Sequence, residues 1–209
     1  MNLKSNIGSF VVATKLQKSF MLKIIGQLIL QFSGWKVIDN TPNGVNSYHR
    51  AVMIAAPHTS NWDYLFCMAT IYSVKLQIRY LAKASLFKFP LGILMRGLGG
   101  IPVNREKKNN LVEEMAQLLK TSPEPIQLIV PAEGTRSYTS EWKSGFYHIA
   151  LKAEVPIILG FLDYKKKEGG FLDVFYPTGN YEADLNIIQA YYLNVTPKYP
   201  ALFSLKDKK

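Results

Sequence analysis

The sequence predicts an α/β fold, a single domain with a mixed, mostly parallel β-sheet flanked by helices. The chain has 209 residues, a length typical of one large domain. It is 48% hydrophobic and 19% charged, with 12 Tyr and 11 Phe, and this composition excludes a disordered chain. Beyond Asn40, short apolar runs alternate with segments of helical periodicity, the pattern of a sheet covered by helices.

The amino-terminal segment, residues 1–40, is both apolar and basic. Its longest charge-free stretch, Ile24–Trp35, has 12 residues, whereas a membrane-spanning helix needs about 20. On a helix, one side carries Met21, Ile25, Leu28 and Phe32, and the other carries Lys15, Lys18, Ser19, Lys23 and Gln27. We therefore predict an amphipathic helical segment over residues 1–40 that lies in the membrane interface. An amphipathic helix packed on its own domain would show the same pattern.

The strands are predicted from apolar runs bounded by turn residues. Ala51–Ala56 (AVMIAA) has no polar residue and is typical of a strand covered on both faces. The other predicted strands are Gln77–Ala82, Gly100–Val103, Pro125–Val130, Pro156–Leu162 and Gly170–Tyr176.

The helices are predicted from apolar residues at helical spacing and from capping residues. Ser60 or Asn61 is the expected cap of the first helix beyond residue 40, and Asn109 that of a later one. The predicted helices are Asn61–Ser73, Leu86–Gly97 with an interruption at Pro90, Asn109–Lys120, Ser144–Lys152 and Asp184–Val195.

Charge and cysteine content limit the classes of function. The 25 Lys and Arg against 15 Asp and Glu give a net charge of +10, which favours an anionic partner such as a phospholipid surface, an acidic carrier protein or nucleic acid. No nucleic-acid-binding motif is present, so we expect no nucleic-acid partner. Cys67 is the single cysteine, which excludes an internal disulfide and a cysteine zinc site, and we predict no bound metal.

A histidine and an aspartate stand where the Ala51–Ala56 strand runs into a helix. His58 and Asp63 are five residues apart, so they could not face each other within one regular helix. If His58 precedes the helix, its loop can fold over the first turn and let the Asp63 carboxylate accept the imidazole N–H. Such a pair suits the histidine to general-base catalysis, although a hydrogen-bonded loop histidine would look the same in sequence.

Two further polar clusters follow predicted strands. Gly99–Arg105 combines a glycine pair with an arginine that can bind phosphate through two parallel hydrogen bonds. The segment Glu133-Gly134-Thr135-Arg136 follows the Pro125–Val130 strand. No G-x-S-x-G elbow and no G-x-x-x-x-G-K-[ST] phosphate loop is present, so serine hydrolysis and ATP chemistry have no support.

These clusters, in this order, resemble the glycerolipid acyltransferase family of the lysophosphatidic acid acyltransferase type. The family's His-x4-Asp block matches His58 to Asp63, and its glycine-rich block ending in arginine matches Gly99 to Arg105. Its Glu-Gly-Thr-Arg block matches Glu133 to Arg136, and its Val-Pro block matches Val155 to Ile158. On this resemblance, residues 41–209 would be the acyltransferase domain.

The resemblance implies transfer of a fatty acyl group from acyl-CoA or acyl carrier protein, as co-substrate, to the free hydroxyl of a lysolipid. No acyl-enzyme and no cofactor are implied. His58 would be the general base and Asp63 would orient it. The acceptor, 1-acyl-glycerol-3-phosphate, would be bound by Arg105, Glu133, Gly134, Thr135 and Arg136.

Two alternatives stay open. Ala132 stands directly before Glu133 where the family usually has proline, which allows a different acceptor, such as a lyso-aminolipid of the ornithine or glycine type. The chain could also be a non-catalytic protein that binds lipid surfaces.

No small-residue cleavage site follows Leu30, so we expect a peripheral or monotopic protein on the cytoplasmic face of the inner membrane.

Overall fold

A seven-stranded sheet forms the centre of the molecule. The computed structural model describes residues 20–103 and 110–205. The strand order is β1-β7-β6-β2-β5-β3-β4. The strands are β1 Lys36–Asp39, β2 Arg50–Ala55, β3 Ile78–Lys83, β4 Gly100–Val103, β5 Ile126–Pro131, β6 Ile157–Asp163 and β7 Glu168–Phe175. Neighbouring strands are parallel except β6 and β7, which confirms the predicted mixed, mostly parallel sheet.

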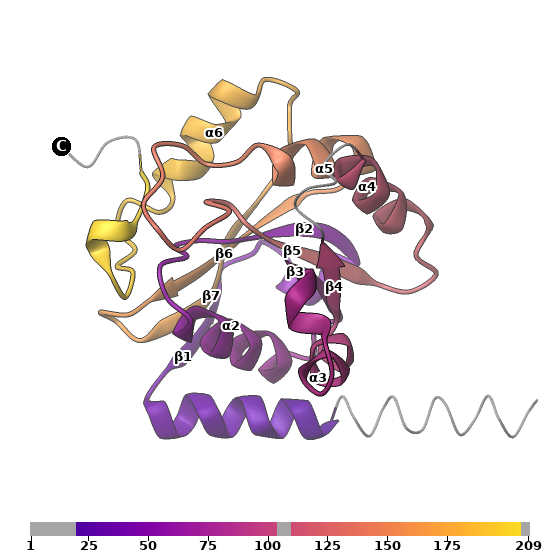
Figure 1. Ribbon diagram of the computed structural model, residues 1–209. Helices are drawn as coiled ribbons and strands as arrows, with labels where there is room; N and C mark the ends of the chain where they lie inside the picture. Colours follow the sequence, from indigo (N-terminus) through magenta and orange to yellow (C-terminus); the bar gives the residue numbers. More distant parts are fainter. Residues whose placement is uncertain (1–19, 104–109, 206–209) are drawn as a thin grey trace, which may run out of the picture.

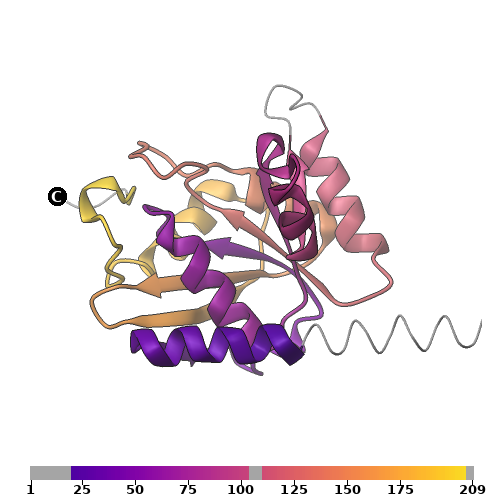
Figure 2. The same cartoon turned by 60° about the horizontal axis from the view of Figure 1, so that its bottom comes forward.

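Helices cover both faces of the sheet (Figure 1). One face carries α4 (Leu111–Thr121), α5 (Gly145–Ala153) and α6 (Tyr181–Ala190). The opposite face carries α2 (Trp62–Ser73), the short helices η2 (Ala84–Phe87) and α3 (Leu91–Gly97), and a helix over residues 20–33. Figure 2 brings the 20–33 helix forward and shows α2 between that helix and the sheet. Two further short helices are η1 (Val45–Ser47) and η3 (Pro200–Leu202).

The burial of β2 explains its uninterrupted apolar sequence. Val52 and Ile54 belong to the core beneath α4, α5 and α6, whereas Ala51 and Met53 belong to the core beneath α2. Successive side chains of a strand point to opposite faces of the sheet. Because both faces are covered by helices, neither set of side chains could be polar.

Two elements differ from the sequence prediction. β1 was not predicted and pairs with β7 at the sheet edge, so the last residues of the 1–40 segment belong to the sheet rather than to a helix. The closing helix, predicted as Asp184–Val195, is Tyr181–Ala190, because the Asn180 side chain accepts the Ala183 N–H and starts the helix earlier. The predicted cap Asn109 lies outside the described residues, and Asn110 is the N-cap of α4.

The 20–33 helix packs on α2 through one face and exposes another. A Cβ atom at Gly26 would lie 2.6 Å from the Ala69 carbonyl oxygen, so glycine permits the close approach of the two helices. Leu30 is buried against Ala69. The apolar face predicted from the sequence points outward, and Phe32 is 87% exposed. Within the described residues, no helix is long and apolar enough to cross a bilayer.

Candidate active site

The candidate site lies at the carboxyl ends of three adjacent parallel strands. β2 pairs with β5 on one side and with β6 on the other, both in parallel, so all three strands end at the same edge of the sheet. His58 follows β2, Glu133 follows β5 and Tyr164 follows β6. Such sheet edges are where open α/β folds bind their ligands.

Asp63 makes four polar contacts, three with the loop that precedes α2 and one with Tyr164, the residue that follows β6. Its Oδ2 accepts the backbone N–H groups of Thr59 (2.7 Å) and Ser60 (2.8 Å), which folds this loop over the first turn of the helix. The same oxygen lies 3.3 Å from His58 Nδ1. The loop therefore brings His58 and Asp63 together as their spacing in the sequence predicted.

The pairing orients the His58 imidazole. Asp63 is buried, whereas the His58 side chain is 22% exposed. Because a carboxylate accepts from an N–H, this contact favours the proton on Nδ1 and leaves Nε2 free to accept another. The arrangement can remove a proton from a hydroxyl group and then hold the resulting imidazolium beside a carboxylate.

Glu133 supports the His58 loop from inside the protein. Its side chain is fully buried, and its Oε1 accepts the backbone N–H of His58 (3.1 Å). Burial raises the pKa of Glu133 from 4.5 to about 8; the His58 hydrogen bond opposes the shift and the nearby Asp63 charge adds to it. A carboxyl group with this pKa is protonated at neutral pH. The structure thus places Glu133 behind the histidine loop, facing away from solvent.

Arg136 lies on the same loop as Glu133, but its side chain points to the other side of that loop. Its Nη1 donates to the Asn61 side-chain oxygen at the start of α2, so Arg136 reaches the loop that carries His58. Thr135 Oγ1 accepts the backbone N–H of Ser137, and Gly134 has a φ of +68°, a conformation that favours glycine. Arg105, the other predicted phosphate ligand, lies outside the described residues.

A cavity of about 520 Å³ opens beside the His58–Asp63 pair. Its polar lining at the sheet edge comes from His58, Asp63, Asn61 and Arg136. Deeper in the protein, between α2 and the sheet, the walls are mainly apolar; they include Met53, Met68, Ile71, Ile129 and Phe171. The volume is in the range of ligand sites, and the lining suits an apolar chain whose polar end lies beside His58.

Tyr164 belongs to the site, and sequence reasoning missed it. Its hydroxyl donates to Asp63 Oδ1 at 2.7 Å, although the two residues are 101 positions apart in the sequence. Lys198 Nζ lies 5.6 Å from the Tyr164 ring centroid and 5.0 Å from that of Trp62, so it makes cation–π contacts with both rings. A signal was present, because Tyr164 follows directly on a buried strand that ends at the same sheet edge.

Cys67 lines the cavity one turn into α2, but the ionisation of its thiol does not suit it to act as a nucleophile. Burial and the nearby Asp63 charge raise the pKa of the thiol to about 12, so the reactive thiolate is scarce at neutral pH. In the part of the chain that the structure describes, no three His, Cys, Asp or Glu side chains gather in a way that could hold a metal ion.

The fold and the site together define a class of α/β protein in which a His/Asp pair faces an apolar chamber at the carboxyl edge of the sheet. The chain belongs to the acyltransferase family, whose family model matches residues 36–158. That match runs from β1 to the first residues of β6 and includes His58, Asp63 and the Glu133–Arg136 loop.

Individual relatives agree with the family. The chain is 33% identical over 131 residues to a 1-acyl-sn-glycerol-3-phosphate acyltransferase of Haemophilus influenzae, which covers 60% of this chain and 52% of the relative. It is 32% identical over 120 residues to an uncharacterised acyltransferase of Schizosaccharomyces pombe, covering 53% of this chain and 41% of that one. The chain therefore spans about half the length of these relatives, or less.

A solved structure shows the same fold. The crystal structure of the 1-acyl-sn-glycerophosphate acyltransferase PlsC from Thermotoga maritima superposes with a TM-score of 0.59 at 18% sequence identity. The alignment covers 82% of this chain and 75% of that one. At this identity the likeness concerns the fold.

Proposed function

We propose that the protein transfers a fatty acyl group from acyl-CoA or acyl carrier protein to the free hydroxyl of a lysolipid. The proposed acceptor is 1-acyl-glycerol-3-phosphate, and the product is then phosphatidic acid. The observation that carries the proposal is the His58–Asp63 pair, 3.3 Å apart, at the open end of an apolar cavity of about 520 Å³. The cavity suits a fatty chain, and the pair suits activation of a hydroxyl group.

In the proposed reaction His58 Nε2 takes the proton of the acceptor hydroxyl as its oxygen attacks the thioester carbonyl carbon. The new carbon–oxygen bond forms, the carbon–sulfur bond breaks, and the proton passes from the imidazolium to the departing thiolate. Asp63 holds Nδ1 and balances the transient positive charge. The protein forms no covalent bond to the acyl group in this scheme, consistent with the protonated state of Cys67.

Arg136 is proposed to bind the phosphate of the acceptor, together with Arg105. Replacing Arg136 with glutamine should raise the KM for a phosphate-bearing lysolipid about 10- to 100-fold, because charged hydrogen bonds are lost, and should leave the KM for the thioester nearly unchanged. Initial rates measured while each substrate is varied in turn check this. The matched control is Arg50→Gln, because Arg50 lies at the amino end of β2 and the candidate site lies at the carboxyl end. Equal increases in both KM values would contradict the assignment.

Tyr164 is proposed as a positioning residue that acts through Asp63. In Tyr164→Phe, Asp63 Oδ1 loses its 2.7 Å hydroxyl donor. We expect kcat to fall about tenfold with little change in KM. The acid limb of the pH–rate profile should move to higher pH, because a carboxylate with one donor fewer attracts the imidazolium more strongly. Tyr176→Phe, on an exposed tyrosine, is the control. An unshifted profile would show that Tyr164 only supports the fold.

The proposed location is the cytoplasmic face of the inner membrane, with the protein bound peripherally or monotopically. Support comes from the outward apolar face of the 20–33 helix, where Phe20, Ile25, Leu28 and Phe32 are exposed. A large apolar face on a structured helix is unusual on a soluble surface and typical of a helix that lies in a lipid interface.

One assay tests the function. The purified protein is incubated with a labelled acyl thioester, on CoA or on acyl carrier protein, and with a panel of lysolipids with and without phosphate. Transfer to 1-acyl-glycerol-3-phosphate is the expected result. Transfer only to phosphate-free lyso-aminolipids would replace the acceptor but keep the reaction. No transfer to any acceptor would favour a non-catalytic lipid-binding protein and reject the proposal.

A further inference from the structure

The segment from η2 to α3, residues 84–97, projects from the domain and exposes large apolar side chains. We call it the η2–α3 arm. Phe89 is 86% exposed, Ile93 68% and Leu94 56%. These side chains stand on an element that is itself well packed. Phe87, Gly92 and Met95 are buried, and a Cβ atom at Gly92 would lie 2.0 Å from the Phe87 carbonyl oxygen. The arm therefore presents its apolar side chains in a defined direction.

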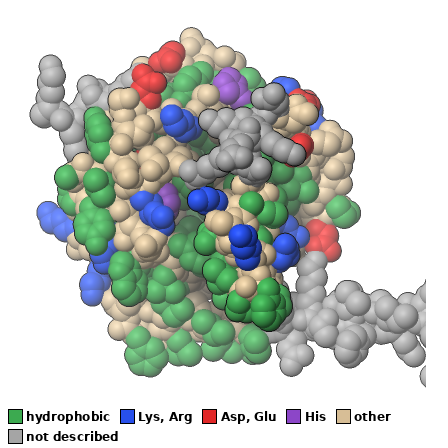
Figure 3. Space-filling view, in the orientation of Figure 1, with side chains coloured by type: hydrophobic (Ala, Val, Ile, Leu, Met, Phe, Trp, Pro, Cys, Tyr) green, Lys and Arg blue, Asp and Glu red, His purple; other side chains and the backbone are tan. Residues whose placement is uncertain are grey.

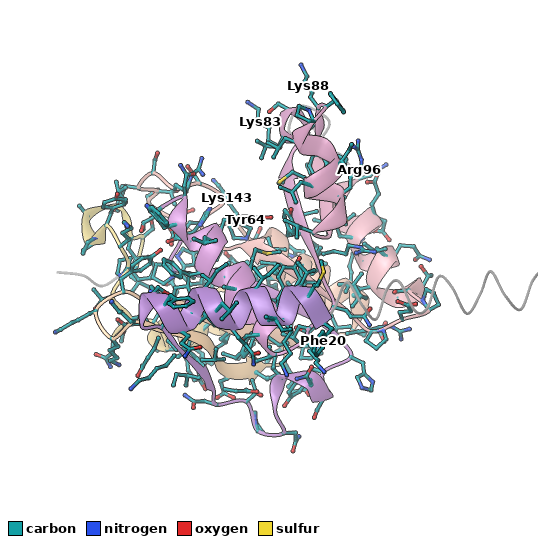
Figure 4. The ribbon with its side chains drawn as sticks, turned by 90° about the horizontal axis from the view of Figure 1, so that it is seen from below. Phe20, Tyr64, Lys83, Lys88, Arg96 and Lys143 are labelled. Atoms are coloured by element: carbon teal, nitrogen blue, oxygen red, sulfur yellow. The ribbon has the colours of Figure 1, made fainter. Side chains whose placement is uncertain are left out.

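Positive charge borders the exposed apolar side chains. Lys83, Lys88 and Arg96 are exposed on and beside the arm, and Figure 4 shows Lys83 and Lys88 at its projecting end and Arg96 on its flank. Arg96 also donates to the carbonyl oxygens of Phe87 and Gly92 (both 3.4 Å). From Tyr64 to Arg105 the sequence has six Lys or Arg and no Asp or Glu. The arm is thus complementary to an anionic surface with an apolar interior.

The arm lies on the same side of the molecule as the 20–33 helix. Figures 1 and 4 both place the Phe20 end of that helix on the side of α3. In Figure 3 hydrophobic side chains form a border along the lower edge of the molecule, and Lys and Arg side chains gather above it. One lipid surface could therefore contact both elements, with the cations at the level of the headgroups.

The arm is also a wall of the cavity. Leu86 and Met95 line it from the arm, and Tyr64 and His58 line it from the other side. The apolar outer surface of the arm is thus close to the chamber that faces His58. A lipid tail that leaves a bilayer beside the arm would stay in contact with apolar side chains on its way into this chamber.

We propose that the η2–α3 arm is a second membrane-binding element, which inserts Phe89, Ile93 and Leu94 into an anionic phospholipid bilayer and holds the cavity opening at the lipid surface. The inference rests on the proposed function and adds the element that binds the substrate-bearing surface. A bilayer fits the arm better than a second copy of the chain, because a symmetric contact would bring the exposed lysines of both copies together.

Binding to vesicles tests the proposal. Wild type and Ile93→Asp, both as full chains, are sedimented with vesicles of phosphatidylcholine and phosphatidylglycerol. We expect Ile93→Asp to lower the partition coefficient about tenfold, because an apolar side chain no longer inserts and a like charge meets the lipid. Lys83→Gln and Lys88→Gln should each lower it about fivefold at low salt and much less at high salt.

Matched variants separate the arm from the rest of the surface. Ile187→Asp makes the same change at a 51% exposed isoleucine on α6, across the sheet from the arm, and should leave binding unchanged. Ile25→Asp, on the 20–33 helix, is the positive control. In a second measurement, brominated phospholipid should quench the fluorescence that Ile93→Trp adds to that of the native tryptophans, and should not quench the fluorescence that Ile187→Trp adds.

Two results would overturn the proposal. One is wild-type binding by Ile93→Asp together with no quenching at position 93. The other is a wild-type dimer in solution that Ile93→Asp dissociates, since the arm would then bind a second copy. A separate assay detects a failure of the proposed function. It measures acyl transfer to a short-chain lysolipid below its micellar concentration, where the reaction needs no membrane, and an absence of transfer there would reject the function but not the membrane-binding role of the arm.

Discussion

Replacing His58 with alanine is expected to lower kcat for acyl transfer by about 100- to 10,000-fold, the usual contribution of a positioned general base. The side chain that is proposed to remove the hydroxyl proton is lost, and Glu133, the carboxyl group behind the same loop, is buried away from solvent. The fold should survive, because the His58 side chain is partly exposed and its backbone N–H, which donates to Glu133, is kept. The release of free thiol from the thioester, followed in the presence of lysolipid, measures the change.

The control for this variant is His49→Ala. His49 is exposed and precedes β2, whereas His58 follows the same strand, so the two histidines lie at opposite ends of it. His49→Ala should keep wild-type kcat, and thermal unfolding should show that both variants are folded. If His58→Ala retained kcat within about fivefold of wild type, His58 would not be the base.

Replacing Glu133 with glutamine is expected to remove a large dependence of stability on pH. The pKa of Glu133 is about 8 in the folded protein, against an ordinary value of 4.5. At a pH between these two pKa values, Glu133 keeps its proton in the folded state and has lost it in the unfolded state. The free energy of unfolding therefore falls as pH rises through this window, by at most about 1.4 kcal/mol per pH unit, and levels off above the folded pKa.

Glutamine carries no charge at any of these pH values and keeps an oxygen that can accept the His58 N–H. Glu133→Gln should therefore be more stable than wild type at pH 8, by several kcal/mol, and nearly equal to it at pH 4.5. Urea unfolding at pH 5, 6, 7 and 8 gives the free energy of unfolding of both proteins. The difference between the two free energies cancels the contributions of the other titrating groups. Glu141→Gln, an exposed carboxyl in the same loop, is the control. Parallel stability curves for wild type and Glu133→Gln would show that Glu133 is ionised in the folded state.

The loop after β2 shows how far a local pattern can be interpreted. The spacing of His58 and Asp63 predicted that the loop would fold back on the first turn of α2, and the contacts of Asp63 with Thr59 and Ser60 show how it does so. All of these residues lie within six positions of one another. Local backbone geometry therefore allowed the pairing to be expected, on the condition that His58 precedes the helix.

The loop after β5 shows the opposite case. Sequence analysis assigned Glu133 and Arg136 to one acceptor-binding group, but the structure turns Glu133 inward to His58 and Arg136 outward to Asn61. Which side chain faces the interior depends on how the loop sits against α2 and β2, and neither neighbour is close in sequence. The acceptor-binding role of this loop stays a proposal, now centred on Arg136.

By itself the sequence determined the alternation of strands and helices, the His58–Asp63 pairing, and an amphipathic amino-terminal helix, because each depends on residues a few positions apart. Tertiary structure alone decided which face of that helix meets α2, where a glycine at position 26 allows close packing. It also decided that Tyr164 donates to Asp63 and that the arm faces the same side as the helix. These features arise where distant segments meet at one sheet edge, and periodicity along a chain carries no information about such meetings.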